Sequence, residues 1–560
     1  MIREVVPFGD SAWLVEVDSV DVAQQLASSL QQEIVANTAP MAIGDVVVGF
    51  RSLVVHVDPL TNDPQRSQPW LAQLEDSLRA GSEADDLPAA ARRVDIPTTF
   101  DGPDLDEVAE VAGLAADAVV ELLTGCELRV AFLGFSPGFP YLVGLPPALE
   151  AVQRRASPRT SVPPGSVALA GGFAAVYPQS TPGGWMLVGR TSLPLFDPEV
   201  PPYARLRAGD IVRFRPTDPE GTVSPVDFGR TGSSSGRAPR RAQSPRFVEV
   251  LEPGLLSLVE DGGRTSVASI GIPDAGPADP DSMRLANRLV GNPDDDAAIE
   301  VTARGPTLRF RADAHIAVVT ATHESIDLTI DRHPVGDDTV VPVSNGQTVS
   351  AGQLRHGLRA YLGIAGGIEI PMVVGSRSSD VLSGLGLGPL VAGDQLDLGA
   401  PRHPRGFLTP ARSEGSVSDP SVIRVIEGPH RFGPEGLDRL CSIRWRVSDA
   451  SNRVGLRLSA PGAALSTPGR IHSTGTVTGA VQVPPDGQPI VLMPDHATVG
   501  GYPVIACVIR ADLARLGQLR GGDFLGFELV THPMARDGLI EHERMLANRV
   551  SGWFPAETGT

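Results

Sequence analysis

The chain contains no lysine: all 47 of its basic residues are arginine. Without a lysine side chain the protein cannot form a Schiff base, cannot provide the phosphate-binding lysine of a P-loop, and cannot carry covalently attached biotin. A nucleotide phosphate would have to be bound by arginine, by backbone amides at turns or helix ends, or by a metal ion.

Cysteine is scarce as well, and a surplus of positive charge is missing. The three cysteines, Cys126, Cys441 and Cys507, are too far apart for a CxxC metal pair and too few for a disulfide framework, so we interpret them as small core residues. The 47 basic residues face 66 acidic ones, a formal charge of −19, which argues against nucleic acid and anionic membranes as partners.

Long apolar runs are also absent. No stretch of about 18 apolar residues occurs, and the N-terminal "MIREVVPFGDSAWLVEV" lacks the charged, apolar and small-residue regions of a signal peptide. We therefore expect a cytoplasmic protein without a membrane-spanning segment.

What the sequence does contain is typical of a large globular protein of mainly β structure with α+β elements. Its 560 residues exceed the size of a single hydrophobic core, and 41% of them are hydrophobic. Most segments are short, β-branched and bounded by Gly or Pro, as in "VVVGFRSLVVHVDP" and "RVIEGP". The helical patterns are few: "DLDEVAEVAGL", "AADAVVELLTG", "ADPDSMRLANRLVG", "ARDGLIEHERMLANRV" and a short helix near residues 70–80.

Two segments rich in Gly, Ser, Pro and Arg divide the chain, "TDPEGTVSPVDFGRTGSSSGRAPRRAQSPR" and "APRHPRGFLTPARSEGSVSDPS". We expect an N-terminal α+β subdomain at 1–86, a barrel at 87–216, a flexible linker at 217–246, a first lobe of the second half at 247–400, a second barrel-like lobe at 421–530, and a C-terminal helix and tail at 531–560.

A pattern of about fifty residues occurs twice. "GSVALAGG…YPQSTPGGWMLVGR…LRAGDIVRF" begins at Gly165, and "GAVQVPPDGQP…MPDHATVGGYPVIACVI…LRGGDFLGF" begins at Gly479. Each has a strand after Gly, a Pro-bounded loop ending in Gly-Gly-aromatic, another strand, and Leu-Arg-x-Gly-Asp before a closing strand. This shared order predicts two related β-barrel modules.

The stretch "FLGFSPGFPYLVGLP" has neither a helical nor a strand period. Pro137 fixes one corner of a turn, and Gly138 supplies the positive φ that a type II turn needs at the next position. Such a rigid turn is either a buried structural corner, which we favour, or a cradle whose backbone amides bind a ligand.

Several longer motifs resemble known families. "LGFSPGFPYLVGLP", "ASPRTSVPPGSVALAGG", "YPQSTPGGWMLVGRT" and "LRAGDIVRF" resemble the B subunit of 5-oxoprolinase, whose family is also called kinase A inhibitor or allophanate hydrolase subunit 1. "EPGLLSLVEDGGRTSVASIGIPDAGPADPDSMRLANRLVGNPDDDAAIEVTARGPTLRF", "GLRAYLGIAGGIEIPMVVGSRSSD" and "SNRVGLRL" resemble the C subunit of 5-oxoprolinase, or allophanate hydrolase subunit 2. The chain thus resembles a fusion of the two subunits, which are related to the carboxyltransferase domain of urea amidolyase.

The resemblance implies cyclophilin-like β-barrels in both halves and a role as an ATP-dependent amide hydrolase component. In that family the B and C subunits act with a separate A subunit to open the lactam of 5-oxo-L-proline to L-glutamate, with ATP and magnesium. Two alternatives stay open: a biotin-dependent carboxyltransferase or amidolyase-like unit for urea-type amides, which would need biotin on another protein, and a non-catalytic binder of the histidine-kinase-inhibitor kind. Assembly of several copies of the chain is also left open.

The resemblance, together with the chemistry of the residues, suggests a set of site residues. As catalytic candidates we take Asp279, Asp495 and His496. Asp279 could instead cap the following helix, and His496 could be a merely exposed loop residue. The candidates for binding substrate or nucleotide are Gly138, Arg159, Tyr177, Gly183, Gly184, Arg264, Arg453, Gly500, Gly501 and Tyr502; no metal ligands are predicted.

We further predict that the "PGGW" and "VGGY" loops bring residues of both halves to one cavity. These residues are Arg159, Tyr177, Gly183 and Gly184 from the first half and Asp279, Arg453, Asp495, His496 and Tyr502 from the second. The alternative is that these loops are hairpin corners on opposite faces of the molecule. Four residues depart from the family patterns: Phe173, Glu260 and Ala497 stand where glutamine is usual, and Thr474 stands where glutamate is usual. Lost hydrogen bonds at these positions suggest a different substrate or a weaker activity.

Overall fold

The computed structural model describes residues 1–36, 39, 42–61, 67–74, 92–218, 237–321, 326–405, 407–408, 421–433 and 435–551. Most of the predicted linker at 217–246, most of the break at 400–421 and the tail after residue 551 lie outside the described residues. Residues of every other predicted segment are included.

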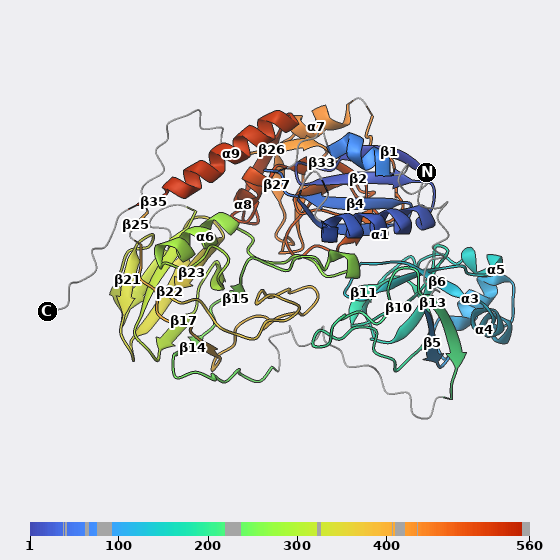
Figure 1. Cartoon of the computed structure of the whole chain (residues 1–560), viewed down its shortest axis with the longest axis horizontal. Helices are drawn as coiled ribbons and strands as arrows, with labels where there is room; N and C mark the ends of the chain where they lie inside the picture. Colours follow the sequence, from blue (N-terminus) through green and yellow to red (C-terminus); the bar gives the residue numbers. More distant parts are fainter. Residues whose placement is uncertain are drawn as a thin grey trace.

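The N-terminal lobe is a four-stranded antiparallel sheet covered on one face by a helix (Figure 1). In spatial order its strands are β1 (Ile2–Pro7), β2 (Ala12–Val17), β4 (Ser52–Val57) and β3 (Ile43–Gly49), and its long helix is α1 (Val20–Ala36). Alternate side chains of a strand point to opposite faces. Trp13 and Val15 pack in the core beneath α1, whereas Ala12 and Leu14 pack in a core shared with other lobes. Both faces of this sheet are therefore buried.

The first half continues into a seven-stranded sheet that curls back on itself. Its strands, in spatial order, are β12 (Met186–Arg190), β9 (Ser166–Ala170), β10 (Phe173–Val176), β7 (Pro140–Val143), β6 (Leu128–Leu133), β13 (Ile211–Pro216) and β5 (Arg93–Thr98). Thr99, just after β5, bridges Arg190 of β12 and nearly closes the barrel. Smaller elements of this lobe are helices α3 (Leu105–Ala112), α4 (Ala116–Gly125) and α5 (Pro147–Glu150) and the strand pair β8 (Arg159–Val162) with β11 (Thr181–Gly183).

The second half begins with two sheets around a single core that includes Val250, Phe310, Ile316 and Leu362. The six-stranded sheet has the order β20 (His333–Pro334), β19 (Ile326–Ile330), β22 (Thr348–Leu354), β17 (Thr307–Phe310), β14 (Phe247–Glu252), β24 (Gln395–Asp397). The five-stranded sheet has the order β15 (Leu256–Glu260), β16 (Ala298–Thr302), β23 (Arg359–Ile364), β18 (Ala314–Thr320), β21 (Val340–Val343). Helix α6 (Pro280–Leu289) packs on β18 and β23 of the second of these sheets.

The C-terminal part of the chain forms a closed seven-stranded barrel. Its strands are β26 (Val422–Glu427), β33 (Val504–Val508), β30 (Ala480–Gln482), β31 (Ile490–Leu492), β28 (Gly455–Ser459), β27 (Trp445–Val447) and β34 (Phe524–Leu529). The second half also contains three helices, α7 (Gly436–Ser442), α8 (Leu513–Leu516) and α9 (His532–Asn548), and two 3-10 turns, η2 (Ala268–Ile270) and η3 (Arg510–Asp512). It has two further strand pairs, β29 (Thr474–Gly475) with β32 (Val499–Gly500) and β25 (Phe407–Leu408) with β35 (Val550–Ser551).

The two barrels have the same strand order, which confirms the repeat seen in the sequence. In each, the first strand pairs in parallel with the last: β5 with β13, and β26 with β34. The remaining neighbours then correspond one by one around both barrels, and each barrel has one extra strand pair, β8–β11 or β29–β32. The "LRAGDIVRF" and "LRGGDFLGF" motifs lead into the equivalent strands β13 and β34.

The halves pack tightly against each other. Phe50, in the turn after β3, donates its backbone N–H to the Ser473 carbonyl at 2.7 Å, and Ser52 Oγ lies 3.0 Å from Thr474 Oγ1. One hydrophobic core contains residues of the N-terminal sheet, the first barrel and the second barrel, among them Leu14, Phe132 and Val499. The N-terminal sheet therefore lies against the C-terminal barrel, as Figure 1 shows with blue strands beside orange and red ones.

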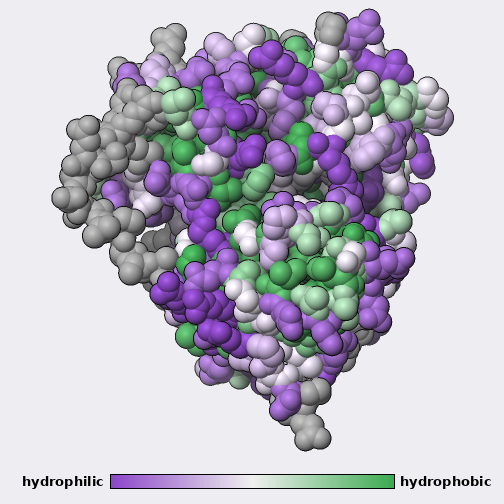
Figure 2. Space-filling view, turned by 90° about the vertical axis from the view of Figure 1, so that its right-hand side faces the viewer, coloured by the Kyte–Doolittle hydropathy of each residue, from purple (hydrophilic) through white to green (hydrophobic). Residues whose placement is uncertain are grey.

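The first barrel forms the right-hand end of the molecule in Figure 1 and carries α3 and α4 there. Seen from that side, hydrophobic residues gather in a patch surrounded by hydrophilic ones (Figure 2). Val111 of α3 is one of the exposed large hydrophobic residues of the described chain, at 53% exposure. Among the described residues, none of the helices combines the length and the hydrophobicity that a membrane-spanning helix needs.

Candidate functional site

A pocket of about 580 Å³ opens where three lobes meet. The N-terminal sheet contributes residues 42–44 and 56–58, the first lobe of the second half contributes residues around 273–284, and the C-terminal barrel contributes residues around 476–498 and 510–516. Both halves of the chain are therefore needed to form it. Its volume lies in the range of about 300–1000 Å³ that is usual for small-molecule sites.

His496 forms part of the pocket wall and is the one predicted catalytic residue among the lining residues. Its Nδ1 lies 2.9 Å from the Ala497 carbonyl oxygen, which can only accept a hydrogen bond. Nδ1 therefore carries the proton in the neutral ring, and Nε2 is the basic nitrogen. Burial lowers the pKa of His496, so the ring is neutral near pH 7 and Nε2 can accept a proton.

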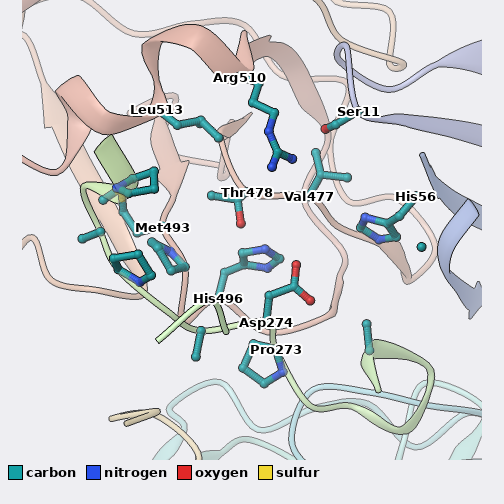
Figure 3. Close-up of a pocket in the computed structure, with 18 of the residues that line it drawn as sticks. Ser11, His56, Pro273, Asp274, Val477, Thr478, Met493, His496, Arg510 and Leu513 are labelled. Carbon is teal, nitrogen blue, oxygen red and sulfur yellow. The ribbon is translucent and has the colours of Figure 1, made fainter. Parts of the chain in front are cut away.

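His56 comes from β4 of the N-terminal sheet, and its ring enters the same pocket from the opposite side (Figure 3). Burial lowers its pKa to about 4, and the nearby His496 contributes to the shift. Its Nε2 atom is buried and has no hydrogen-bond partner within the described part of the chain. Two neutral histidines, one from each half of the chain, therefore face a common space.

Asp274 and Arg510 supply the charges. The Asp274 carboxyl group is exposed to the pocket but surrounded by protein on its other sides. This burial raises the pKa of Asp274 to about 6; the Asp45 carboxylate adds to the rise, and Arg510 opposes it. Arg510 begins η3, and its guanidinium group points toward the centre of the pocket in Figure 3. Within the described residues it forms no ion pair at 4.0 Å or less, and its backbone N–H donates to Asp10 at 2.8 Å. The pocket thus combines a cation, a carboxyl group and two neutral bases.

Arg453 and Asp495 lie in a buried ion network next to His496 and do not line the pocket. Arg453 is 4% exposed and donates to both Asp495 oxygens at 2.8 and 3.0 Å, to Glu300 at 2.7 Å and to the Gly276 carbonyl at 2.6 Å. Nearly all of its donors are used within the protein, so its contacts are those of a structural residue. Through the peptide bond between Asp495 and His496, this network fixes the position of the histidine.

Asp279 has the contacts of a helix cap, one of the two roles considered from the sequence. It precedes α6, and its carboxylate accepts hydrogen bonds from the Ser282 N–H at 3.0 Å, the Ser282 hydroxyl at 2.6 Å and the Gln518 side chain at 2.6 Å. Burial raises its pKa to about 6. Arg264 is buried too, and donates to the carbonyl groups of Val373 and Ser378 at 3.2 and 2.6 Å. Neither residue lines the pocket.

The Pro-Gly turn is a buried corner between the two halves. Gly138 has φ +72°, and a Cβ atom there would lie 3.1 Å from the Leu195 carbonyl oxygen. Its N–H donates to the Ile270 carbonyl at 2.9 Å, so this amide is already used. Arg159, another of the predicted binding residues, forms an ion pair with the buried Asp104 at 2.7 Å.

The two Gly-Gly-aromatic loops approach each other, but through an aromatic cluster and not around the pocket. Trp185, after Gly183 and Gly184, lies 5.7 Å from Tyr141 between ring centroids, and Tyr141 forms a hydrogen bond with Ser473, next to the strand that pairs with Gly500. The Tyr177 ring lies 5.1 Å from Phe139 in this cluster. On the other loop, Gly501 accepts a hydrogen bond from Ile471, and Tyr502 lies beneath the Arg470 guanidinium at 5.8 Å. The loops are thus not on opposite faces of the molecule. Of the residues predicted to share one cavity, however, only His496 lines this pocket.

Two of the residues that depart from the family patterns form contacts between lobes. Phe173 packs edge-on against Phe50 at 5.3 Å, and Thr474 meets Ser52. Both residues therefore connect the barrels with the N-terminal sheet.

Comparison with known proteins agrees with this architecture. Residues 3–206 match the family model "Carboxyltransferase domain, subdomain C and D", and residues 270–529 match "Carboxyltransferase domain, subdomain A and B". The fold and the order of its halves therefore define a carboxyltransferase-domain protein.

Individual relatives show to which family within this class of proteins the chain belongs. The chain is 36% identical to the C subunit of 5-oxoprolinase from Escherichia coli K12 over 286 residues, which are 50% of this chain and 90% of that protein. It is 48% identical to the B subunit of 5-oxoprolinase from Escherichia coli O157:H7 over 149 residues, 26% of this chain and 68% of that protein. The crystal structure of TTHA0988 superimposes with a TM-score of 0.77 at 33% identity, covering 94% of this chain and 100% of that one. The chain belongs to the family of the 5-oxoprolinase B and C subunits, with both of them fused in one polypeptide.

The urea amidolyase of Saccharomyces cerevisiae is also similar, at 33% identity over 319 residues. The matched part is 52% of this chain but 17% of the amidolyase. The similarity therefore concerns a small part of that much longer enzyme.

Proposed function

We propose that the chain is the fused B and C component of an ATP-dependent 5-oxoprolinase, which acts with a separate A subunit. The reaction is 5-oxo-L-proline + ATP + water → L-glutamate + ADP + phosphate. The observation that carries this proposal is the presence of both subunit-like halves in one chain, packed so that a single pocket is lined by both.

The pocket residues suit proton transfer at a lactam. His496 Nε2 can accept a proton from an attacking water or return one to the departing nitrogen, because the ring is neutral near pH 7 and its Nδ1 is held by the Ala497 carbonyl. Asp274, with a pKa of about 6, can hold a lactam N–H or share a proton with the ring. ATP and magnesium enter this proposal as co-substrates, and no residue of this chain is assigned to them.

The test is reconstitution. The full chain is mixed with the A subunit, ATP, magnesium and 5-oxo-L-proline, and glutamate is measured, with parallel reactions that omit either the A subunit or ATP. We expect glutamate only in the complete mixture. No glutamate, under conditions where the same A subunit is active with separate B and C subunits, would refute the proposal.

A second candidate, favoured by the similarity to urea amidolyase, is a carboxyltransferase unit for urea-type amides. Because the chain has no lysine, biotin would be carried by another protein. Transfer of carboxylate from a carboxylated biotin carrier to urea, in the presence of the full chain, would support this function. The same experiment without transfer, together with glutamate formation in the first, would exclude it.

A further inference from the structure

Among the described residues, the pocket has one cation that the protein does not neutralise through an ion pair. Its other lining arginine, Arg284, is held by Glu543 at 2.7 and 2.8 Å and by Asp294 at 3.1 Å. Arg510, in contrast, is exposed to the pocket and forms no ion pair within the described part of the chain. A guanidinium group placed in this way offers two parallel N–H donors to a planar anion such as a carboxylate.

On the opposite side of the open space lies a hydrogen-bond acceptor. Asp274 and Arg510 interact electrostatically, and Figure 3 shows both side chains directed into the space between them. The carboxyl group of Asp274 can accept an N–H but would repel a second anion. A ligand that suits both groups must therefore carry its negative charge at one end and an N–H donor next to it.

Uncharged hydrogen-bonding groups complete the wall. Thr478 lines the pocket beside His496, and Thr498 Oγ1 is buried without a hydrogen-bond partner among the described residues. Thr476 donates its hydroxyl proton to the Ala497 carbonyl at 2.6 Å and is therefore not free to donate to a ligand. Thr478 and Thr498 can bind a carbonyl oxygen or a water molecule.

From this arrangement we propose that the pocket binds a small amido acid or lactam acid, with its carboxylate on Arg510 and its amide N–H on Asp274. The inference rests on the proposed function for the choice of 5-oxo-L-proline as the probe, since that molecule has a carboxylate adjacent to a lactam N–H. It adds what the family membership does not provide: the location of the acid-binding site, and the two residues that recognise the ligand. His56, from the other half, closes the wall of the same space.

The test is calorimetric titration of the full chain with 5-oxo-L-proline, with neither the A subunit nor ATP present. We expect binding to the wild-type chain, and a Kd raised about 10- to 100-fold in Arg510→Gln, the loss typical for a hydrogen-bonded ion pair. Arg510→Lys should recover part of the affinity because it keeps the charge. Arg431→Gln, at an exposed site with a 92% accessible side chain, is the matched control and should bind as the wild type does.

A second ligand makes the test specific. 2-Pyrrolidinone has the lactam but no carboxylate, so Arg510→Gln should not change its affinity. Asp274→Leu, in contrast, should weaken the binding of both ligands. Equal binding of 5-oxo-L-proline by Arg510→Gln and wild type, or no binding to wild type at about 10 mM ligand, would overturn the assignment.

The outcomes separate this inference from the proposed function. If the reconstituted complex forms glutamate but Arg510→Gln has an unchanged Kd and KM, the function stands and the site assignment is wrong. If Arg510 is required for binding but no glutamate forms in the reconstituted mixture, the acid-binding site stands and the proposed reaction is wrong. Circular dichroism of the variants checks that each one is folded.

Discussion

Replacement of Arg453 by methionine should destabilise the protein strongly, because it leaves buried carboxylates without their cation. Arg453 contacts Asp495 and Glu300 directly and lies 3.4 Å from Glu260. Burial alone would raise the pKa of Glu300, yet Arg453 and Arg359 hold it at about 2, compared with 4.5 for a free glutamate. That shift corresponds to about 3 kcal/mol of stabilisation of the ionised carboxylate, and breaking a buried ion pair typically costs about 3–5 kcal/mol.

The destabilisation should depend on pH in a defined direction. Without Arg453, the folded-state pKa values of the buried acids rise above their unfolded values, so the folded protein binds more protons than the unfolded chain. Stability of the variant is then lost as pH increases. We expect the difference from wild type to be larger at pH 8 than at pH 5.

Urea denaturation followed by circular dichroism measures this effect, with Arg431→Met as the control for loss of an exposed arginine. A free energy of unfolding within about 1 kcal/mol of wild type, combined with lost ligand binding, would refute this reasoning. It would instead support the role of Arg453 in binding substrate or nucleotide that the sequence predicted.

Three further predictions concern other parts of the molecule. Gly49→Ala should weaken packing between the halves by about 1–3 kcal/mol, because its Cβ would lie 2.6 Å from the Ser473 carbonyl oxygen; Gly125→Ala, with no neighbour within 4 Å of its Cβ, should leave the thermal midpoint almost unchanged. Glu260→Gln should stabilise the protein at pH 8 but not at pH 4 in urea titrations, since burial raises the pKa of Glu260 well above its usual value and the acid therefore loses stability as pH rises. Asp274 has a pKa of about 6, set by burial, Asp45 and Arg510, and therefore becomes ionised between pH 5 and 8. Calorimetry over this range should show that 5-oxo-L-proline binds more tightly as the pH rises. Asp274→Asn should remove this pH dependence.

The repeated barrel can be predicted from the sequence because its signals are local. Gly and Pro fix the turns, and the Leu-Arg-x-Gly-Asp motif marks the closing strand of each barrel. The four quoted helical patterns coincide with α3, α4, α6 and α9. Helix α1 is not among the predicted helices, although its buried residues Val20, Ala23, Leu26 and Leu30 have helical spacing. This signal is present in the sequence.

The site is harder to predict because its residues come together only through packing between lobes. His496 can be recognised as a loop histidine suited to proton transfer. His56, in contrast, lies in the apolar strand segment "SLVVHV", where a histidine is ordinarily one more strand residue, and its role depends on a lobe more than 400 positions away in sequence. Asp274 lies within a motif that resembles the C subunit, but its pKa depends on burial and on Asp45 and Arg510 from two other elements.

Arg453 shows the same dependence on packing. The sequence shows an arginine in a family motif and cannot show that three acids surround it. In the structure Arg453 is buried and surrounded by carboxylates, which are the contacts of a structural residue.

The most direct test of the account is a crystal structure of the full chain with 5-oxo-L-proline bound. The account predicts ligand density in the pocket between the N-terminal sheet and the second half, with the carboxylate within hydrogen-bond distance of Arg510 and the lactam nitrogen facing Asp274. Ligand density beside Trp185 in the aromatic cluster, with none in the pocket, would contradict it.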